Sequence, residues 1–143
     1  MGIVTSTNSQ TIVRCGILWQ DQQHSELLRC IRNLQQKILD KTLDMTELNR
    51  IRTFLVWYVD LHFATEEAYM AELAYPGRAA HKAEHEGMTN KLMNLFEVIE
   101  DGMGHPDLHA CAQLCVDLNK WYLSHIAGPD QDLAAFLKQQ GVR

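Results

Sequence analysis

Residues 62–85 of the 143-residue chain read HFATEEAYMAELAYPGRAAHKAEH. On one side of Pro76 and Gly77 the stretch has a histidine and a glutamate four residues apart, and on the other side it has two histidines four residues apart. Proline and glycine separate consecutive helices, and residues four apart share one helix face. The stretch therefore predicts two helices that carry their polar pairs close to the turn that joins them.

Apolar residues recur with helical spacing on both sides of this stretch. The spacing predicts four long helices, over about residues 20–40, about residues 44–73, from shortly after Gly77 to Ile99, and from Pro106 to His125. Short connections between four such helices favour an all-α, up-down-up-down antiparallel four-helix bundle.

Three residues are expected to define helix ends. Asp44 is suited to cap the second helix, Pro106 to stand in the first turn of the fourth, and Asp130 to cap a short last helix that ends near Gln140. Before the bundle, residues 1–15 show no helical pattern and are rich in serine and threonine. We therefore expect an irregular polar leader over residues 1–15 and a bundle domain over residues 16–143.

Composition excludes several classes of protein. With a net charge of −5 and no basic stripe, the chain is not expected to bind nucleic acid. The leader lacks the basic and apolar segments of a secretion signal, and no stretch is long enough to span a bilayer, so we expect a cytoplasmic protein without membrane insertion. In that compartment the four cysteines, Cys15, Cys30, Cys111 and Cys115, are expected to remain thiols.

Seven potential metal ligands occupy corresponding places in the expected helices. They are His24, His62, Glu66, His81, His85, His125 and Asp130. In an antiparallel bundle, the start of the first and third helices and the end of the second and fourth lie together. Buried imidazoles and carboxylates without a cation would leave charge uncompensated, so the set predicts a metal site. His105 and His109 lie at the far end, where we expect surface histidines.

The number of donors indicates more than one metal ion. Five imidazoles and two carboxylates exceed what one zinc or iron ion binds, and a histidine-rich set without thiols suits iron. If Glu66, Asp130 and a hydroxide each bridge two irons, three imidazoles complete one six-coordinate ion. Two imidazoles leave the other ion five-coordinate, with an open position for a small ligand.

The residues around these donors carry a family resemblance. Over about residues 16–137 the chain resembles hemerythrin-like domains, most of all the bacterial single-domain hemerythrins. The similarity rests on four motifs, which are DxQH at residues 21–24, HFxxEExxM at 62–70, Tyr75 and Pro76 followed by HxxEH at 81–85, and WxxxHIxxxD at 121–130.

The resemblance implies a non-haem diiron centre with an oxo or hydroxo bridge. It implies that His81, His85 and His125 bind one iron and that His24 and His62 bind the other. Glu66 and Asp130 would bridge the two ions, and dioxygen would bind at the iron held by the histidine pair.

The resemblance also suggests an oxygen pocket formed by Phe63, Trp121, Tyr122 and Ile126, although ordinary core packing explains Phe63 and Trp121 equally well. Tyr122 stands where the family commonly has leucine. Its phenol could hydrogen-bond to a bound oxygen ligand, or it could point its hydroxyl to solvent.

Glu67 and Glu84 are a further pair of candidates near the expected site. Their carboxylates could accept hydrogen bonds from imidazole N–H groups, although exposed helix carboxylates are the commoner case.

The function implied is reversible dioxygen binding for storage, transport or delivery to an oxygen-consuming enzyme, by a monomer and without a catalytic residue. An oxygen or redox sensor and a diiron oxidase or peroxidase remain open as alternatives. Ferritin-like oxidases have more carboxylates and carry Glu-x-x-His on two helices. No glutamate here stands three residues before a histidine, which argues against that class.

Overall fold

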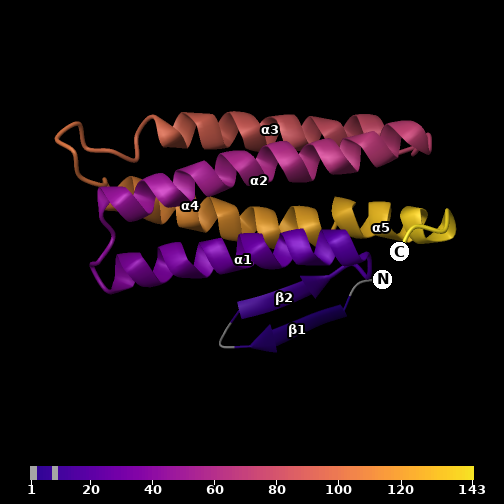
Figure 1. Ribbon diagram of the computed structural model, residues 1–143, viewed down its shortest axis with the longest axis horizontal. Helices are drawn as coiled ribbons and strands as arrows, with labels where there is room; N and C mark the ends of the chain where they lie inside the picture. The colour runs from indigo at the N-terminus through magenta and orange to yellow at the C-terminus, as the bar shows by residue number, and fades with distance from the viewer. Residues whose placement is uncertain (1–2, 8–9) are drawn as a thin grey trace.

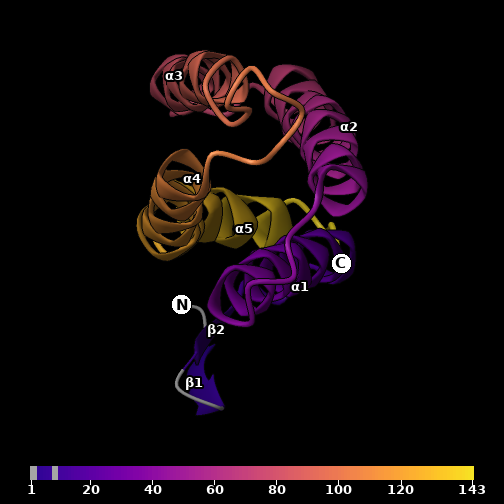
Figure 2. The same ribbon diagram turned by 90° about the vertical axis from the view of Figure 1, so that its left-hand side faces the viewer.

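The computed structural model describes residues 3–7 and 10–143, with side chains from residue 12 onward. Its long helices form the expected antiparallel bundle (Figure 1), and the end view shows α1 to α4 around a shared interior (Figure 2). The helices are α1 (Leu18–Leu39), α2 (Met45–Glu72), α3 (Arg78–Phe96), α4 (Leu108–Trp121) and α5 (Pro129–Gln139), with a π-helical turn η1 (Tyr122–Ile126) between α4 and α5. The prediction of an all-α four-helix bundle is confirmed.

The leader differs from the prediction. Strand β1 (Ile3–Thr7) pairs antiparallel with β2 (Gln10–Arg14), and the hairpin lies beside α1 (Figure 1). The expectation of an irregular leader was wrong because both segments are rich in β-branched residues, which favour extended backbone even in a polar stretch. Val13 is 3% exposed and belongs to the core of the bundle. The domain boundary at residue 16 stays a prediction.

Helical periodicity places one apolar stripe of each helix in the core. On α1 the stripe includes Leu27, Ile31 and Leu34, and it packs against Leu48 and Leu55 of α2 within one continuous hydrophobic cluster. Each such side chain contributes about 2 kcal/mol when it is fully removed from water. Among the described residues, no helix is both long enough and apolar enough to cross a membrane.

The connection between α3 and α4 corrects two expectations. Helix α3 ends at Phe96, so Ile99 lies beyond it, although its side chain is buried in the same core. Pro106 precedes α4 and does not lie in its first turn. The N-cap is Asp107, whose carboxylate accepts a hydrogen bond from the Ala110 N–H at 3.0 Å, and aspartate is among the strongest capping residues. The Asp44 cap of α2 is confirmed by the bond from the Glu47 N–H at 2.9 Å.

The junction of α4 and α5 corrects the role of Asp130. The N-cap of α5 is Gly128, and Asp130 lies in the first turn with its side chain fully buried. A Cβ atom at Gly128 would lie 2.7 Å from the Ser124 carbonyl oxygen, so only glycine allows α5 to begin this close to η1. Pro129 fixes the backbone of the first helical residue. This tight junction turns the Asp130 carboxylate into the bundle and away from a capping position.

Candidate metal centre

The structure brings all seven predicted donors into one buried cluster, and none of them is more than 3% exposed. Their donor atoms form two groups that share both carboxylates. The three-histidine group contains His81, His85 and His125 with Glu66 and Asp130, and the two-histidine group contains His24 and His62 with the same carboxylates. His105 and His109 are exposed near the start of α4, as predicted, and neither belongs to the cluster.

The Asp130 carboxylate divides its two oxygens between the groups. Oδ1 lies 2.9 Å from Nε2 of both His81 and His125. Oδ2 lies 3.0 Å from Nε2 of His24 and 3.6 Å from Nε2 of His62. Each oxygen therefore faces the imidazoles of one group only.

The carboxylate of Glu66, on α2, also turns its two oxygens to different groups. Its Oε1 lies 3.2 Å from Nε2 of His81 and 3.0 Å from Nε2 of His85, whereas Oε2 lies 3.4 Å from Nε2 of His62. Oε2 also accepts a 2.9 Å hydrogen bond from the amide of the fully buried Gln20. Because Gln20 is fixed in α1, this bond orients the Glu66 carboxylate between the two groups.

Electrostatic attraction between imidazoles and carboxylates stabilises the cluster. Burial alone would lower the pKa of His81, but the adjacent Asp130 and Glu66 carboxylates outweigh burial and raise the pKa to about 9. Burial and the charge of Asp130 would raise the pKa of Glu66, yet His62, His81 and His85 lower it to about 2. The pKa of Asp130 is likewise well below its usual value, because the close imidazoles, His125 and His24 above all, outweigh its burial. Both carboxylates are therefore ionised.

Several donor atoms in this cluster have no hydrogen-bond partner among the described residues. They are buried and include Nε2 of His62, His85 and His125 and Oδ1 of Asp130. Nitrogen and oxygen atoms left unpaired in a protein interior are costly, and a cation between them would satisfy all of them. The donor set thus fits a metal site, and imidazoles with carboxylates and no thiolate fit iron.

The two groups also differ in the residues that lie next to the outer nitrogens, Nδ1, of their imidazoles. In the three-histidine group, His85 Nδ1 lies 2.9 Å from a Glu67 carboxylate oxygen, and His125 Nδ1 lies 3.7 Å from that of Glu84. The first distance confirms a hydrogen bond to Glu67. The second is an ion-pair contact with a half-exposed side chain.

The two-histidine group has uncharged outer partners. His62 Nδ1 lies 2.6 Å from the amide oxygen of Gln23, and His24 Nδ1 lies 3.9 Å from the Cys15 sulfur. Burial, followed by the charges of Asp130 and Asp21, raises the pKa of the Cys15 thiol, so this sulfur is protonated at neutral pH. The outer partners of the two groups therefore differ in charge.

Aromatic rings enclose the imidazoles. Phe63 stacks on His85 and Trp121 stacks on His125, each with ring centroids 3.9 Å apart. Tyr58 stacks on His62 at 5.0 Å. Ile126 is fully buried beside His125 in η1. These rings limit the access of water to the cluster, whether or not they also line an oxygen pocket.

The structure decides one of the two expectations stated for the hydroxyl of Tyr122. The residue is 2% exposed, and its oxygen accepts a 3.0 Å hydrogen bond from the Val13 N–H. Tyr122 therefore does not point its hydroxyl to solvent, and its phenol oxygen is engaged by β2. A hydrogen bond from its O–H group to a bound oxygen ligand stays a prediction.

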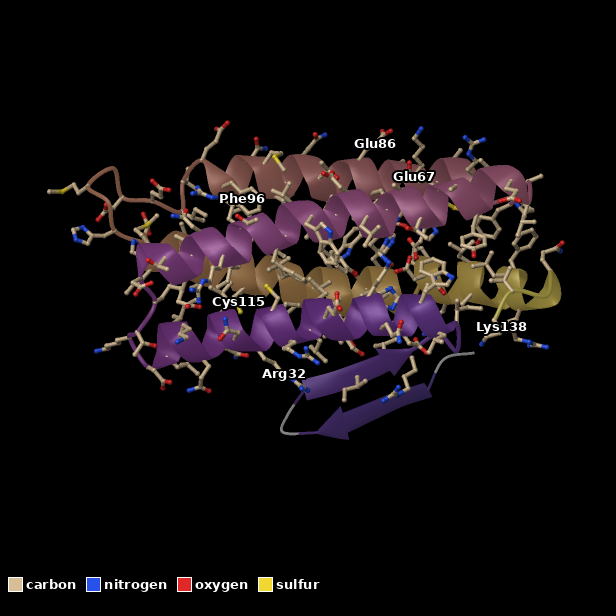
Figure 3. The ribbon with its side chains drawn as sticks, viewed as in Figure 1. Arg32, Glu67, Glu86, Phe96, Cys115 and Lys138 are labelled. Carbon is tan, nitrogen blue, oxygen red and sulfur yellow. The ribbon has the colours of Figure 1, made fainter. Side chains whose placement is uncertain are left out.

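The hairpin is attached close to the cluster. Asp21 accepts hydrogen bonds from the N–H groups of Cys15 at 2.6 Å and Gly16 at 3.0 Å. Lys138 of α5, labelled in Figure 3, donates to the Cys15 carbonyl at 2.5 Å. Gly16 has φ +85°, and a Cβ there would collide with the Lys138 side chain, so the turn requires glycine. These bonds hold β2 over the start of α1, where His24 lies.

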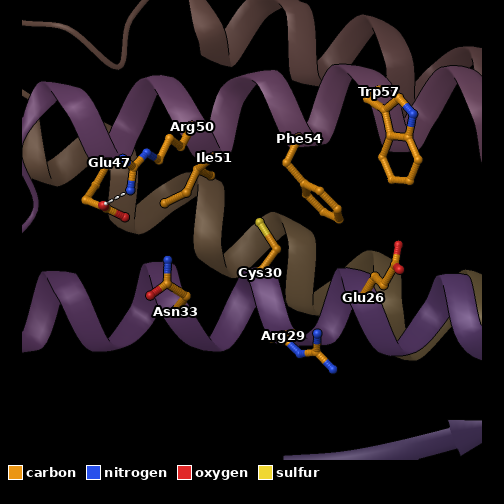
Figure 4. Close-up of a pocket in the computed structure, with 9 residues that line it drawn as sticks. All are labelled: Glu26, Arg29, Cys30, Asn33, Glu47, Arg50, Ile51, Phe54 and Trp57. Atoms are coloured by element: carbon orange, nitrogen blue, oxygen red, sulfur yellow. Dashed lines mark hydrogen bonds and ion pairs between the residues drawn. The ribbon is translucent and has the colours of Figure 1, made fainter.

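A separate groove of about 630 Å³ lies between α1 and α2 (Figure 4). Phe54, Trp57, Ile51 and Cys30 give it an apolar surface, and charged side chains such as Arg29 and Glu26 line it as well. None of the seven clustered donors is among its lining residues. The groove is therefore distinct from the candidate metal centre.

Sequence reasoning assigned no role in the site to Gln20, Gln23 or Tyr58. A signal was present for two of them. Gln20 lies four residues before His24, and Tyr58 lies four residues before His62, so each shares the inward face of its helix with a donor. A polar residue one turn away from a ligand on a core stripe is a useful sign of a contact with that ligand.

Known proteins resemble this chain in the region that carries the cluster. Residues 15–137 match the model of the hemerythrin HHE cation binding domain. A bacteriohemerythrin of Stenotrophomonas maltophilia is 29% identical over 129 residues, which cover 90% of this chain and 80% of the relative. A bacteriohemerythrin of Methylococcus capsulatus is 25% identical over 138 residues, or 96% of this chain and 85% of the relative. Because the family match covers most of the chain, and the potential metal ligands within it form one buried cluster, the chain belongs to the hemerythrin family.

Proposed function

We propose that the protein binds two iron ions in this cluster and binds dioxygen reversibly between or beside them. The observation that carries the proposal is the division of both carboxylates, each of which turns one oxygen to imidazoles of the three-histidine group and the other oxygen to the two-histidine group. Two carboxylates arranged in this way are suited to bridge two metal ions. The hemerythrin relatives support the same assignment.

In this proposal His81, His85 and His125 hold one iron, and His24 and His62 hold the other. The side with fewer imidazoles keeps a position for a small ligand. When bound, the iron pair supplies two electrons that can be shared reversibly with dioxygen. The chain itself fixes the ligands, through Gln20 on Glu66 and through Glu67 and Gln23 on two imidazoles.

Exclusion of water is the second role of the chain. Phe63, Trp121 and Ile126 are packed against or beside the imidazoles, and no cluster donor is exposed by more than 3%. A dry site slows displacement of a bound oxygen ligand by water or stray protons. The same enclosure supports storage or delivery of dioxygen better than turnover of a larger substrate. A monomeric state and a cytoplasmic location remain predictions.

Anaerobic loading with ferrous iron tests this function. We expect about two irons per chain, uptake of about one dioxygen per iron pair, and a visible absorption band that disappears under argon. Repeated cycles should restore the same band. A band that cannot be reversed, with steady consumption of dioxygen, would instead favour an oxidase, and a chain that retains only one iron would rule out the proposal.

A further inference from the structure

Tyr58 is a buried tyrosine whose hydroxyl is not used by the fold. It lies on α2 one turn before His62, is 2% exposed, and stacks its ring on that imidazole with an interplanar angle of 16°. Its hydroxyl has no hydrogen-bond partner among the described residues. A buried hydroxyl left unpaired costs about 1–3 kcal/mol, so its position calls for a partner that binds there.

The surroundings of this hydroxyl place it next to the candidate metal centre. A phenol hydroxyl is a hydrogen-bond donor, and no acceptor among the described residues holds its proton. Cys15 contacts His24, and Tyr58 stacks on His62, so the phenol lies on the side of the two-histidine group.

The space beside Tyr58 is apolar. A small internal cavity is lined by the phenol ring together with Leu27, Leu55, Phe63 and Trp121, among other apolar side chains. No carboxylate or amide side chain of the described residues lines this cavity. The other phenol of the region, Tyr122, already accepts a hydrogen bond from the Val13 N–H, which restricts the direction of its hydroxyl. Tyr58 is the residue of this lining that carries a hydroxyl, and its ring also stacks on His62 of the two-histidine group.

We propose that the Tyr58 hydroxyl donates a hydrogen bond to the small ligand bound at the two-histidine side, an inference that rests on the proposed function. The bond selects a ligand whose outer atom accepts a hydrogen bond and carries negative charge, such as dioxygen after electron transfer or a linear anion. Tyr58 acts here as a specificity-determining residue, and it adds a donor to a wall that is otherwise hydrophobic.

Azide binding to the diferric protein tests this role without dioxygen chemistry. Sodium azide is titrated into wild type, Tyr58→Phe and Tyr122→Phe, with Tyr69→Phe as a matched control because Tyr69 lies on the same helix and stacks on Trp19. Loss of a hydrogen bond to a charged group should raise the azide Kd of Tyr58→Phe about tenfold or more. Tyr69→Phe should keep the wild-type Kd, and all four proteins should retain two irons.

The infrared stretch of bound azide gives a readout that a packing defect would not imitate. In wild type the band should shift between H₂O and D₂O, because an exchangeable phenol proton bonds to azide, and in Tyr58→Phe this shift should vanish. An unshifted band in wild type, an unchanged Kd in Tyr58→Phe, or an effect confined to Tyr122→Phe would each overturn the inference. If wild type fails to hold two irons, the proposed function itself fails, which iron analysis reveals before azide is added.

Discussion

The three-histidine and two-histidine halves of the candidate metal centre are built differently although they share both carboxylates. The three-histidine half has a carboxylate behind two of its imidazoles, Glu67 at 2.9 Å from His85 and Glu84 at 3.7 Å from His125. The two-histidine half has one imidazole fewer and is backed by an amide and a thiol, those of Gln23 and Cys15. Only the second half has a buried phenol without a partner beside it, within the described residues.

This difference separates two tasks within one site. A carboxylate behind an imidazole makes it a stronger metal ligand, so the three-histidine half is suited to hold its ion firmly. The two-histidine half has weaker metal ligands and, in the proposed site, an open coordination position. The Tyr58 hydroxyl lies nearby as a hydrogen-bond donor. If the proposed function holds, retention of iron and exchange of the small ligand fall to opposite sides, and the shared carboxylates connect them.

Removal of a shared carboxylate should have the largest effect, because it breaks both halves at once. Asp130 lies within 3.6 Å of four imidazoles, so Asp130→Ala should lose both irons, as measured by metal analysis after anaerobic loading. Asp132→Ala, an exposed change on the same turn of α5, should retain both. One iron retained in Asp130→Ala would show that the halves hold their ions independently.

The metal-free protein should lose stability as pH rises from about 6.5 to 9. The folded-state pKa of His81 is raised from 6.5 to about 9, so its contribution is complete below 6.5 and is lost as pH increases through 9. The pKa of His62 is raised as well, because Glu66 and Asp130 outweigh its burial. Thermal unfolding followed by circular dichroism should show this decline in Tm. His81→Gln should flatten the profile, and a Tm that rises over this range would contradict the linkage.

Exchanging the residues behind the imidazoles should change how strongly each half retains iron. Glu67→Gln removes the charge behind His85 and should weaken iron binding about tenfold, as measured by competition with a chelator. The reciprocal change Gln23→Glu places a charge behind His62 and should strengthen iron retention on the other side. Glu72→Gln, at the exposed end of α2, is the control that should leave affinity unchanged. Equal affinities in all of these proteins would remove the proposed difference in ligand strength.

The smallest effect concerns the hairpin that covers the two-histidine half. Tyr122→Phe deletes the acceptor of the Val13 N–H and should lower the free energy of unfolding by about 1 kcal/mol in urea titrations. Iron content should stay at the wild-type level, because the phenol oxygen contacts β2 and is not one of the donor atoms. Loss of iron in this variant would show that Tyr122 supports the cluster directly.

Much of this arrangement follows from local rules. Spacings of four residues put His62 with Glu66 and His81 with His85 on one helix face, and Pro76 with Gly77 reverses the chain between them. Antiparallel topology then brings the ends of distant helices together, so the seven donors were predictable without a structure. The hairpin is the exception, because a polar composition does not by itself indicate irregular backbone, and β-branched residues dominate both strands.

The sequence by itself determined the helices, the seven clustered donors and the end of the bundle at which they meet, because helical periodicity and short turns act over a few residues. Only the tertiary structure decided how each carboxylate divides its oxygens, that Gly128 turns Asp130 inward, and that Tyr122 is engaged by β2 while Tyr58 is left unpaired. These outcomes depend on contacts between residues up to 109 positions apart, whose directions are fixed by packing and not by local spacing.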